Sequence, residues 1–348
     1  MKKPIAITLG DAAGIGPEII AKAYQNAPDS TRGCFVVGDL ATLRRAAQLV
    51  GAGRIALAAA RIETPGEALS LPPRCLPVLQ VGSLAAPPPF GRLSAAAGAL
   101  AAQAVVWAAQ AALRGDIAAL VTAPLHKEAL AMAGAPHSSF PGHTEMLQAQ
   151  AAAHAGKSLA EMPVRMMLAN DQLRVVLVSI HISLRAAIEA VTFANVMQTL
   201  LITHQSLSAI LGRAPRIAVA GLNPHAGEGG LFGREELDFI APAIAQARAQ
   251  GLQVTGPFAP DTVFMRARAK GDHDGDFDVA VAMYHDQGLI PVKYLGLEQG
   301  VNVTLGLPLV RTSPDHGTAF DIAGTGQADA ASLLAALRMA RQLSNGIT

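Results

Sequence analysis

Three histidines follow apolar runs in similar positions along the chain. His181 comes after RVVLVSI, His225 after RIAVAGLNP and His285 after DVAVAMY. Runs of this kind are typical of buried strands, and ligands of open α/β sheets gather beyond the carboxyl ends of strands. If the three strands are neighbours, three imidazoles converge as a catalytic metal site, and such ligands suit zinc, cobalt, nickel or manganese better than magnesium. For each histidine alone, an ordinary polar contact after a strand is the other interpretation.

His143 and Thr144 lie in the stretch FPGHTEML, where Pro141 and Gly142 predict a turn and the following residues can start a helix. An imidazole, a hydroxyl and backbone N–H groups at a helix start form a favourable place for an anion. The alternative is ordinary capping, in which Thr144 accepts hydrogen bonds from helix N–H groups. The residues alone favour neither interpretation.

Lys293, Asn302 and Arg311 stand among apolar residues in IPVKYLGLEQGVNVTLGLPLVRTS. A lysine and an arginine close to buried strands need partners, and a bound phosphate or carboxylate would provide one. Extension of the two side chains to the surface is the alternative. Asp261 follows the proline-rich turn in GPFAPDTVF and could either orient a substrate amine or hydroxyl or cap the next segment.

The glycine-rich stretch LGDAAGIGPE, Leu9 to Glu18, follows the apolar run PIAIT and leads into a predicted helix. Its glycines have the spacing G-x-x-x-G-x-G, whereas the Rossmann fingerprint is G-x-G-x-x-G. The spacing therefore argues against a Rossmann dinucleotide site.

Short β-branched runs alternate with longer alanine-rich segments, which predicts an α/β protein with a largely parallel sheet. The predicted strands are PIAIT, CFVVG, LPVLQVG, IAALVTAP, VRMMLAN, RVVLVSI, RIAVAGLN, DVAVAMY and VNVTLGL. Only the turn around Asn170-Asp171 separates VRMMLAN from RVVLVSI, so these two should form a hairpin. The 348 residues exceed the roughly 250 to 300 that one hydrophobic core supports, which predicts two domains.

The composition is that of a globular protein with a small ligand. Hydrophobic residues make up 51%, charged residues 15%, and the net charge is +1, which argues against disorder and against a broad surface for nucleic acid. Two cysteines in unrelated contexts fit a reducing compartment, and we expect a cytoplasmic protein. Residues 94–113 lack charge over a length that could span a bilayer, but alanine dominates them, so we expect a buried helix and no membrane association.

Seven ordered stretches resemble the 4-hydroxythreonine-4-phosphate dehydrogenase family of pyridoxal phosphate biosynthesis. They are GDAAGIGPE, VTAPLHKEAL, FPGHTEML, GLNPHAGEGG, GPFAPDTVF, AMYHDQGLIPVK and VNVTLGLPLVRTSPDHGTAFDIAGTG. The resemblance implies a two-domain, isocitrate/isopropylmalate dehydrogenase-like fold with αβα layers, a mostly parallel sheet and an active site in the interdomain cleft. It also implies a cofactor-side domain of residues 1–137 plus 306–348, and a metal-binding, substrate-binding and dimerisation domain of residues 138–305.

The resemblance assigns roles to individual residues. The metal ligands match His181, His225 and His285, the same three that the strand ends indicate. The substrate contacts match His143, Thr144, Asp261, Lys293, Asn302 and Arg311, of which Asp261, His143 and Lys293 are candidates for proton transfer. DHGTAFDIAGTG resembles a loop that holds the adenosine of the cofactor in the distant relatives, which implies cofactor contacts at His316, Gly317, Thr318, Asp321 and Gly324.

The implied reaction is the NAD- or NADP-dependent oxidation of 4-phosphooxy-L-threonine, followed by decarboxylation to 3-amino-2-oxopropyl phosphate. One divalent metal per site (zinc, cobalt, nickel, manganese or magnesium) would lower the pKa of the substrate hydroxyl. Ala12 and His126 depart from the usual proline and asparagine of the family, which leaves room for a paralogue that oxidises 4-phospho-threonate, 4-phospho-erythronate or a cis-dihydrodiol dicarboxylate. A homodimer with its active site at the subunit interface is the implied assembly.

Overall fold

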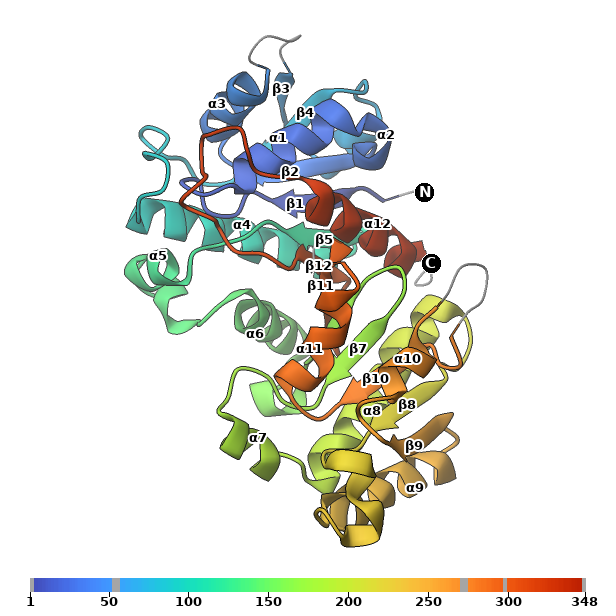
Figure 1. The fold of residues 1–348 in the computed structure, drawn as a ribbon. Coiled ribbons are helices and arrows are strands. Elements are labelled where there is room, and N and C mark those ends of the chain that lie inside the picture. Colours follow the sequence, from blue (N-terminus) through green and yellow to red (C-terminus); the bar gives the residue numbers. More distant parts are fainter. Residues whose placement is uncertain (1–2, 52–56, 270–274, 297–298, 346–348) are drawn as a thin grey trace. The chain divides into compact units, whose positions relative to one another are not determined.

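The computed structural model describes residues 3–51, 57–269, 275–296 and 299–345. The chain divides into two compact units (Figure 1), unit 1 with Met1–Pro163 and Leu307–Ser344, and unit 2 with Val164–Gly306. The domain boundary expected after residue 137 is corrected to one after Pro163. The reason is that helix α6 (His143–Ala155) packs against helix α4 (Ala95–Leu113) of unit 1, so the segment after residue 137 belongs with unit 1.

Unit 1 contains a sheet whose six described strands pair in parallel in the order β3-β4-β2-β1-β5-β12. Its strands are β1 (Ile5–Thr8), β2 (Cys34–Gly38), β3 (Ala58–Ile62), β4 (Cys75–Gln80), β5 (Ala119–Thr122) and β12 (Arg311–Pro314). Its helices are α1 (Gly16–Asn26), α2 (Pro28–Thr31), α3 (Leu40–Val50), η1 (Pro65–Leu69), α4 (Ala95–Leu113), α5 (Lys127–Met132), η2 (His137–Ser139), α6 (His143–Ala155), η3 (Leu159–Glu161) and α12 (Ala331–Asn345).

Helix α4 contains most of the uncharged segment 94–113, which is long enough to span a bilayer. Ser94 caps it by accepting a hydrogen bond from the Ala97 N–H at 3.3 Å, and alanine favours the helix beyond. Gly98 lets α5 approach closely, because a Cβ there would lie 2.1 Å from the carbonyl oxygen of Ala129. Among the described helices, α4 alone is long and apolar enough to cross a membrane. Most of its residues nevertheless lie in the core of unit 1. The expected buried helix is therefore confirmed.

Unit 2 contains a mixed sheet with the described strand order β11-β6-β7-β10-β8-β9, in which β6 runs antiparallel to both of its neighbours. Its strands are β6 (Arg165–Ala169), β7 (Arg174–Leu177), β8 (Ile217–Ala220), β9 (Val254–Phe258), β10 (Val279–Ala282) and β11 (Val301–Leu305). Its helices are α7 (Leu184–Glu189), α8 (Phe193–Leu211), η4 (Pro224–Gly230), η5 (Glu236–Ile240), α9 (Ala241–Ala249), α10 (Val263–Ala267) and α11 (His285–Tyr294).

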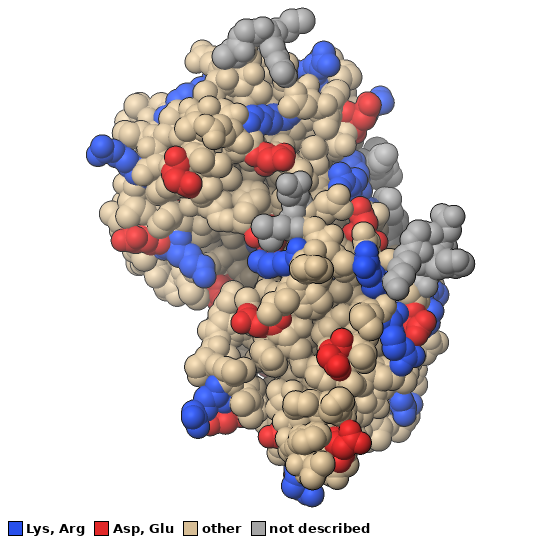
Figure 2. Space-filling model, in the orientation of Figure 1, with Lys and Arg blue, Asp and Glu red and all other residues tan. Residues whose placement is uncertain are grey.

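The nine predicted strands are all present, and the predicted hairpin is β6–β7. Asn170 shapes its turn, since Oδ1 accepts hydrogen bonds from the N–H groups of Gln172 and Leu173 at 2.9 and 2.8 Å. On the face that Figure 2 shows, basic and acidic side chains of the described residues are interspersed, as the small net charge predicts.

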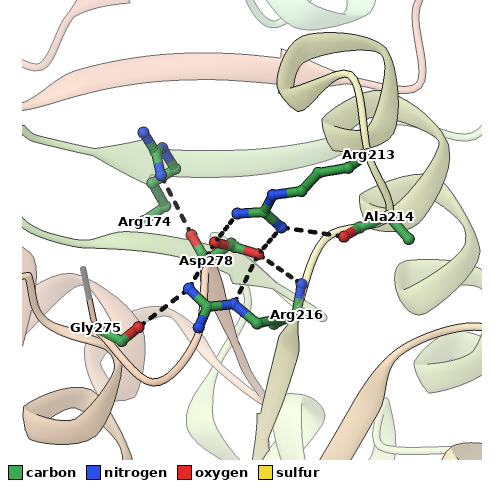
Figure 3. A network of polar contacts seen from close by, with 6 residues as sticks. All are labelled: Arg174, Arg213, Ala214, Arg216, Gly275 and Asp278. Atoms are coloured by element: carbon green, nitrogen blue, oxygen red, sulfur yellow. Dashed lines mark hydrogen bonds and ion pairs between the residues drawn. The ribbon is translucent and has the colours of Figure 1, made fainter.

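A charged cluster joins the amino ends of three neighbouring strands of unit 2 (Figure 3). Asp278, next to the start of β10, accepts hydrogen bonds from both terminal nitrogens of Arg213 at 2.7 and 2.8 Å. It also accepts from Nη2 and the backbone N–H of Arg216, which precedes β8, at 3.0 and 2.7 Å. Arg174, the first residue of β7, donates to the Asp278 carbonyl at 3.4 Å. We call these four residues the Asp278 cluster.

The Asp278 cluster stabilises the fold above acidic pH. Burial alone raises the pKa of the Asp278 carboxyl, but the hydrogen bonds from Arg213 and Arg216 outweigh it and hold the pKa well below its usual range. A carboxyl whose pKa is lower in the folded than in the unfolded state stabilises the protein above the unfolded pKa, about 4. This contribution is lost as the pH falls from there toward the folded pKa.

We expect Asp278→Asn to lower the free energy of unfolding at pH 7 by about 2 kcal/mol, because two guanidinium groups lose their carboxylate. The partly exposed arginines keep the loss below that of a fully buried pair. Urea denaturation measures it, and the difference from wild type should shrink on acidification below pH 4. Asp276→Asn is the matched control, since Asp276 and its partner Arg266 are both exposed and the change should cost less than about 1 kcal/mol. Equal losses in the two variants would contradict this role.

Candidate functional site

The strands that precede the three histidines are neighbours, as the sequence interpretation requires. Strand β10 pairs in parallel with β7 on one side and with β8 on the other. His181, His225 and His285 each follow one of these strands, so all three come after carboxyl ends at the same edge of the unit 2 sheet. The condition on which the predicted metal site depends, that these strands are neighbours, is therefore met.

His181 and His285 lie side by side. Their ring centroids are 5.6 Å apart with an angle of 45° between the rings. The Ser179 hydroxyl donates to the Met283 carbonyl at 3.0 Å and so ties the two loops together. His285 begins α11, and its Nδ1 lies 2.7 Å from Oδ1 of Asp286. A cavity of about 390 Å³ borders both imidazoles and is lined mainly by apolar side chains.

His225 lies apart from this pair within one chain. Its ring faces Phe232, with centroids 6.2 Å apart. Across the described ranges, no three His, Cys, Asp or Glu side chains are grouped closely enough to hold a metal. One chain therefore brings two of the three predicted ligands together, and the three-histidine metal site stays a prediction.

The loop that carries His225 is held in an unusual conformation. Six successive residues, 225 to 230, have positive φ, among them His225 at 52° and Glu228 at 43°. His181 also has a positive φ, 42°. Left-handed backbone is costly for residues other than glycine and clusters at functional sites. Two of the three predicted metal ligands therefore lie in strained backbone.

Two buried or half-buried polar side chains that the sequence analysis missed hold these loops. The Glu236 carboxylate accepts hydrogen bonds from the Leu222 and Asn223 N–H groups at 2.7 and 2.8 Å. Gln287 donates to the Gly221 carbonyl at 2.8 Å and accepts from the Met283 N–H at 2.7 Å, which joins the end of β8 to the start of α11. The signal in the sequence for the left-handed backbone of this loop is the glycine-rich stretch GLNPHAGEGG.

The remaining predicted residues of unit 2 lie on three different elements. Asp261 is exposed in the turn between β9 and α10. Lys293 lies half-buried in the last turn of α11, and Asn302 lies in β11 opposite Leu168 of β6. Lys293 therefore belongs to a helix next to the sheet and not to a strand. Their roles toward a substrate stay predictions.

His143 begins α6, as the sequence predicts, and the residue before it, Gly142, is extended. Burial, followed by the positive charges of Arg311 and Lys127, lowers the pKa of the imidazole well below 6.5, although a hydrogen bond to the Ala123 carbonyl acts in the opposite direction. Since the buried Nε2 has no partner among the described residues, Nδ1–H is the donor to Ala123. His143 is therefore neutral, with a lone pair on Nε2.

Arg311 is a buried cation on a strand. It is the first residue of β12 and is only 6% exposed. Its Nε and Nη2 donate to the Thr122 hydroxyl oxygen at 3.2 and 2.8 Å. Burial lowers the pKa of the guanidinium to about 10, and the charge of Glu145 opposes this shift, so Arg311 remains charged at pH 7.

Thr144 follows His143 in the first turn of α6. It is not the N-cap residue of this helix, which is Gly142.

The residues predicted to contact the cofactor lie between β12 and α12. The Thr318 carbonyl accepts a hydrogen bond from the Ile15 N–H at 3.0 Å, so this loop contacts the glycine-rich loop of residues 9–18. Gly324, at φ 78°, lies against Phe90, where a Cβ would be 2.2 Å from the ring. Asp321 is exposed, and His316 Nδ1 lies 3.1 Å from the carbonyl oxygen of Gly317. The structure thus brings the two loops together within unit 1.

Three polar atoms near these loops are buried without a partner in the described part of the chain. They are Oδ2 of Asp11, Nδ1 of His126 and Nε2 of His316. The His126 ring stacks on Phe320 with centroids 4.6 Å apart. Unsatisfied buried polar groups are rare in native proteins and call for an explanation such as an absent ligand.

Known proteins resemble the whole chain. A curated 4-hydroxythreonine-4-phosphate dehydrogenase of Beijerinckia indica is 53% identical over 98% of this chain and 95% of its own. A curated D-threonate 4-phosphate dehydrogenase of Salmonella typhimurium is 46% identical over 98% and 99%. The crystal structure of 4-hydroxythreonine-4-phosphate dehydrogenase from Klebsiella pneumoniae matches with a TM-score of 0.86 and 42% identity over 99% and 100%.

The fold and these relatives define the class: the chain is an α/β dehydrogenase. The family profile described as pyridoxal phosphate biosynthetic protein PdxA matches residues 30–340. The chain belongs to the PdxA family. The predicted family and fold class are thereby confirmed.

Proposed function

We propose that this enzyme oxidises 4-phosphooxy-L-threonine with NAD or NADP and that the product loses carbon dioxide to give 3-amino-2-oxopropyl phosphate. The observation that carries the proposal is the pairing of a buried, charged Arg311 with a neutral His143 at a helix start in unit 1. This arrangement suits an anionic group next to a hydrogen-bond donor, which a phosphorylated hydroxy amino acid contains.

The residues of unit 1 bind and orient the substrate in this proposal. Arg311 pairs with the anionic group, and the first turn of α6, with Thr144, adds N–H and hydroxyl donors. His143 accepts a hydrogen bond at Nε2 from a substrate hydroxyl or amine and can receive its proton there. Binding energy from the remote anionic group then helps to orient the reacting carbon.

The residues of unit 2 would hold the metal. His181 and His285 already face each other, and imidazole nitrogens suit zinc, cobalt, nickel or manganese. When bound, a divalent metal lowers the pKa of the substrate hydroxyl and withdraws electron density from the oxidised carbon. Asn302 would hydrogen-bond the substrate, and Asp261 would hold its amine. Lys293 would return a proton to carbon after carbon dioxide leaves.

The third metal ligand points to a homodimer. Two imidazoles are too few for a catalytic zinc site, which uses three protein ligands, and His225 lies apart from the pair in its own chain. Large apolar side chains near the histidines are exposed, including Ile182, Leu184, Leu231 and Phe232. Such exposure marks protein interfaces. We therefore place His225 of the partner subunit beside His181 and His285, with the active site at the subunit interface.

The loops of unit 1 would hold the cofactor, which accepts hydride from the substrate when bound. His316, Gly317, Thr318, Asp321 and Gly324 form the proposed adenosine side of this site. The unpaired atoms of Asp11, His126 and His316 fit this assignment, because a bound ligand would supply the missing hydrogen bonds. The glycine-rich loop then lines the nicotinamide end. A cytoplasmic location fits this chemistry.

A second candidate substrate is D-threonate 4-phosphate. Curated relatives of that name are 46% and 47% identical to this chain, compared with 45% and 53% for two of the 4-hydroxythreonine-4-phosphate dehydrogenases. The two substrates share the phosphate and differ in an amine or a hydroxyl, and Nε2 of His143 accepts from either.

The test is a substrate panel. The purified enzyme with a divalent metal receives NAD or NADP together with 4-phosphooxy-L-threonine, D-threonate 4-phosphate, D-erythronate 4-phosphate or a cis-dihydrodiol dicarboxylate, and NADH or NADPH is followed by absorbance. We expect the highest kcat/KM with 4-phosphooxy-L-threonine. A higher value with another compound replaces the proposed substrate, and no oxidation of any compound overturns the dehydrogenase proposal.

A further inference from the structure

The hydroxyl of Thr122 makes two contacts to Arg311, a proposed substrate-binding residue. Thr122 ends β5 and is completely buried, beside β12, whose first residue is Arg311. Its Oγ1 accepts hydrogen bonds from both Nε and Nη2 of Arg311. We propose that Thr122 is a positioning residue that fixes the guanidinium plane of Arg311 for the anionic group of the substrate, an inference that rests on the proposed function.

The geometry explains why a single hydroxyl can do this. A hydroxyl oxygen has two lone pairs, so it can accept from two N–H groups of one guanidinium. Because Nε and Nη2 lie on one edge of that planar group, bonds from both to one oxygen fix the rotation of the plane as well as its place. Planar orientation matters because arginine recognises phosphate and carboxylate with two parallel hydrogen bonds.

Because Arg311 is buried, loss of its hydrogen bonds to Thr122 should have a large effect on the guanidinium. Arg311 sits where water screens little, so its pKa falls to about 10 and its remaining interactions are strong. A guanidinium without the Thr122 acceptor would turn toward another partner. A displacement of about 1 Å from the productive geometry can cost a large factor in rate or binding.

The chain offers a matched control in the neighbouring strand. Thr8 of β1 pairs in register with Thr122 of β5 and is equally buried. Its hydroxyl has no hydrogen-bond partner among the residues that the structure covers. Valine at either position keeps the size and branching of threonine, so the two substitutions differ only in the contact to Arg311.

The experiment compares Thr122→Val, Thr122→Ser and Thr8→Val in the full-length enzyme. We expect Thr122→Val to raise KM for the phosphorylated substrate about tenfold with kcat within about threefold, and to weaken the binding of inorganic phosphate measured by calorimetry by a similar factor. Thr122→Ser keeps the acceptor and should restore both values, and Thr8→Val should match wild type. Unchanged KM in Thr122→Val, no rescue by serine, or an equal effect of Thr8→Val overturns the proposal.

A second measurement needs neither turnover nor a folded valine variant. In ¹⁵N NMR spectra of the wild-type protein and of Thr122→Ser, the Arg311 Nε–H should exchange slowly with solvent, because it donates to a buried oxygen. Exchange as fast as that of the exposed Arg185 overturns the positioning role. If the substrate panel fails while Arg311 Nε–H is protected and phosphate binding depends on Thr122, the proposed function fails and the role of Thr122 stands.

Discussion

Replacing His225 with alanine should lower metal-dependent turnover by at least about a thousandfold while the fold persists. The expected loss is large because a catalytic metal stabilises the transition state by several kcal/mol and, in the proposed site, is held by all three imidazoles. Turnover with added zinc, cobalt or manganese and metal content by mass spectrometry measure the effect. His154→Ala is the control, since His154 is exposed in the last turn of α6 and should be silent. Full activity of His225→Ala after removal of metal would contradict the assignment of His225 as a metal ligand.

Mixed dimers test where the third ligand comes from. We expect each site to take His181 and His285 from one subunit and His225 from the other. In a dimer of one His225→Ala subunit and one His181→Ala subunit, one site then has all three histidines and the other has His285 alone. Two inactive variants, refolded together in equal amounts, should therefore regain about a quarter of wild-type activity, because half of the dimers are mixed and each has one intact site. If all three ligands came from one subunit, mixing would restore nothing.

The second large effect is expected at His143. Asparagine places its amide nitrogen near Nδ1 and can still donate to Ala123, but it leaves nothing at the position of Nε2. Glutamine reaches that position with an oxygen acceptor. We expect His143→Asn to lower kcat/KM by about a hundredfold or more, and His143→Gln to recover about a tenth of the wild-type value or better.

The pH profile separates the neutral imidazole from a charged one. Because burial and the charges of Arg311 and Lys127 lower the pKa of His143 well below 6.5, the ring should add no acidic limb to kcat/KM near pH 6.5. The shape of the profile in His143→Gln should therefore match wild type. A limb near pH 6.5 that disappears in His143→Gln would show that the imidazole is charged in the working enzyme.

The sequence predicted the elements whose residues follow a regular pattern. Strands β7, β8 and β10 lie in short runs of mainly valine, isoleucine, leucine and alanine, so their ends, and the histidines after them, could be located without a structure. The strands that the pattern missed are β3, β9 and β12, which read AAARI, VTGPF and RTSP. Their small, polar or proline residues resemble loops, and only pairing with neighbours makes them strands.

The hydrogen bonds that hold residues of the proposed site could not be predicted, because their partners are far apart in the sequence. Gln287 bridges to Gly221 and Arg311 to Thr122, across 66 and 189 positions. Glutamine and threonine carry no signal of such a bridge. The position of His225 away from His181 and His285 is equally invisible in the sequence, because equivalent strand ends fix an edge of the sheet but not the path of the loop beyond it.

The two ends of β7, β8 and β10 differ in what they contribute to unit 2. Their amino ends are joined by the Asp278 cluster, and their carboxyl ends lead into the loops of the three histidines. Mutations in those loops would therefore change the proposed metal site while the far ends of the strands keep the sheet intact. For protein engineers, this separation means that substrate range can be diversified at one edge of the sheet, and thermal robustness improved at the other, with little trade-off between them.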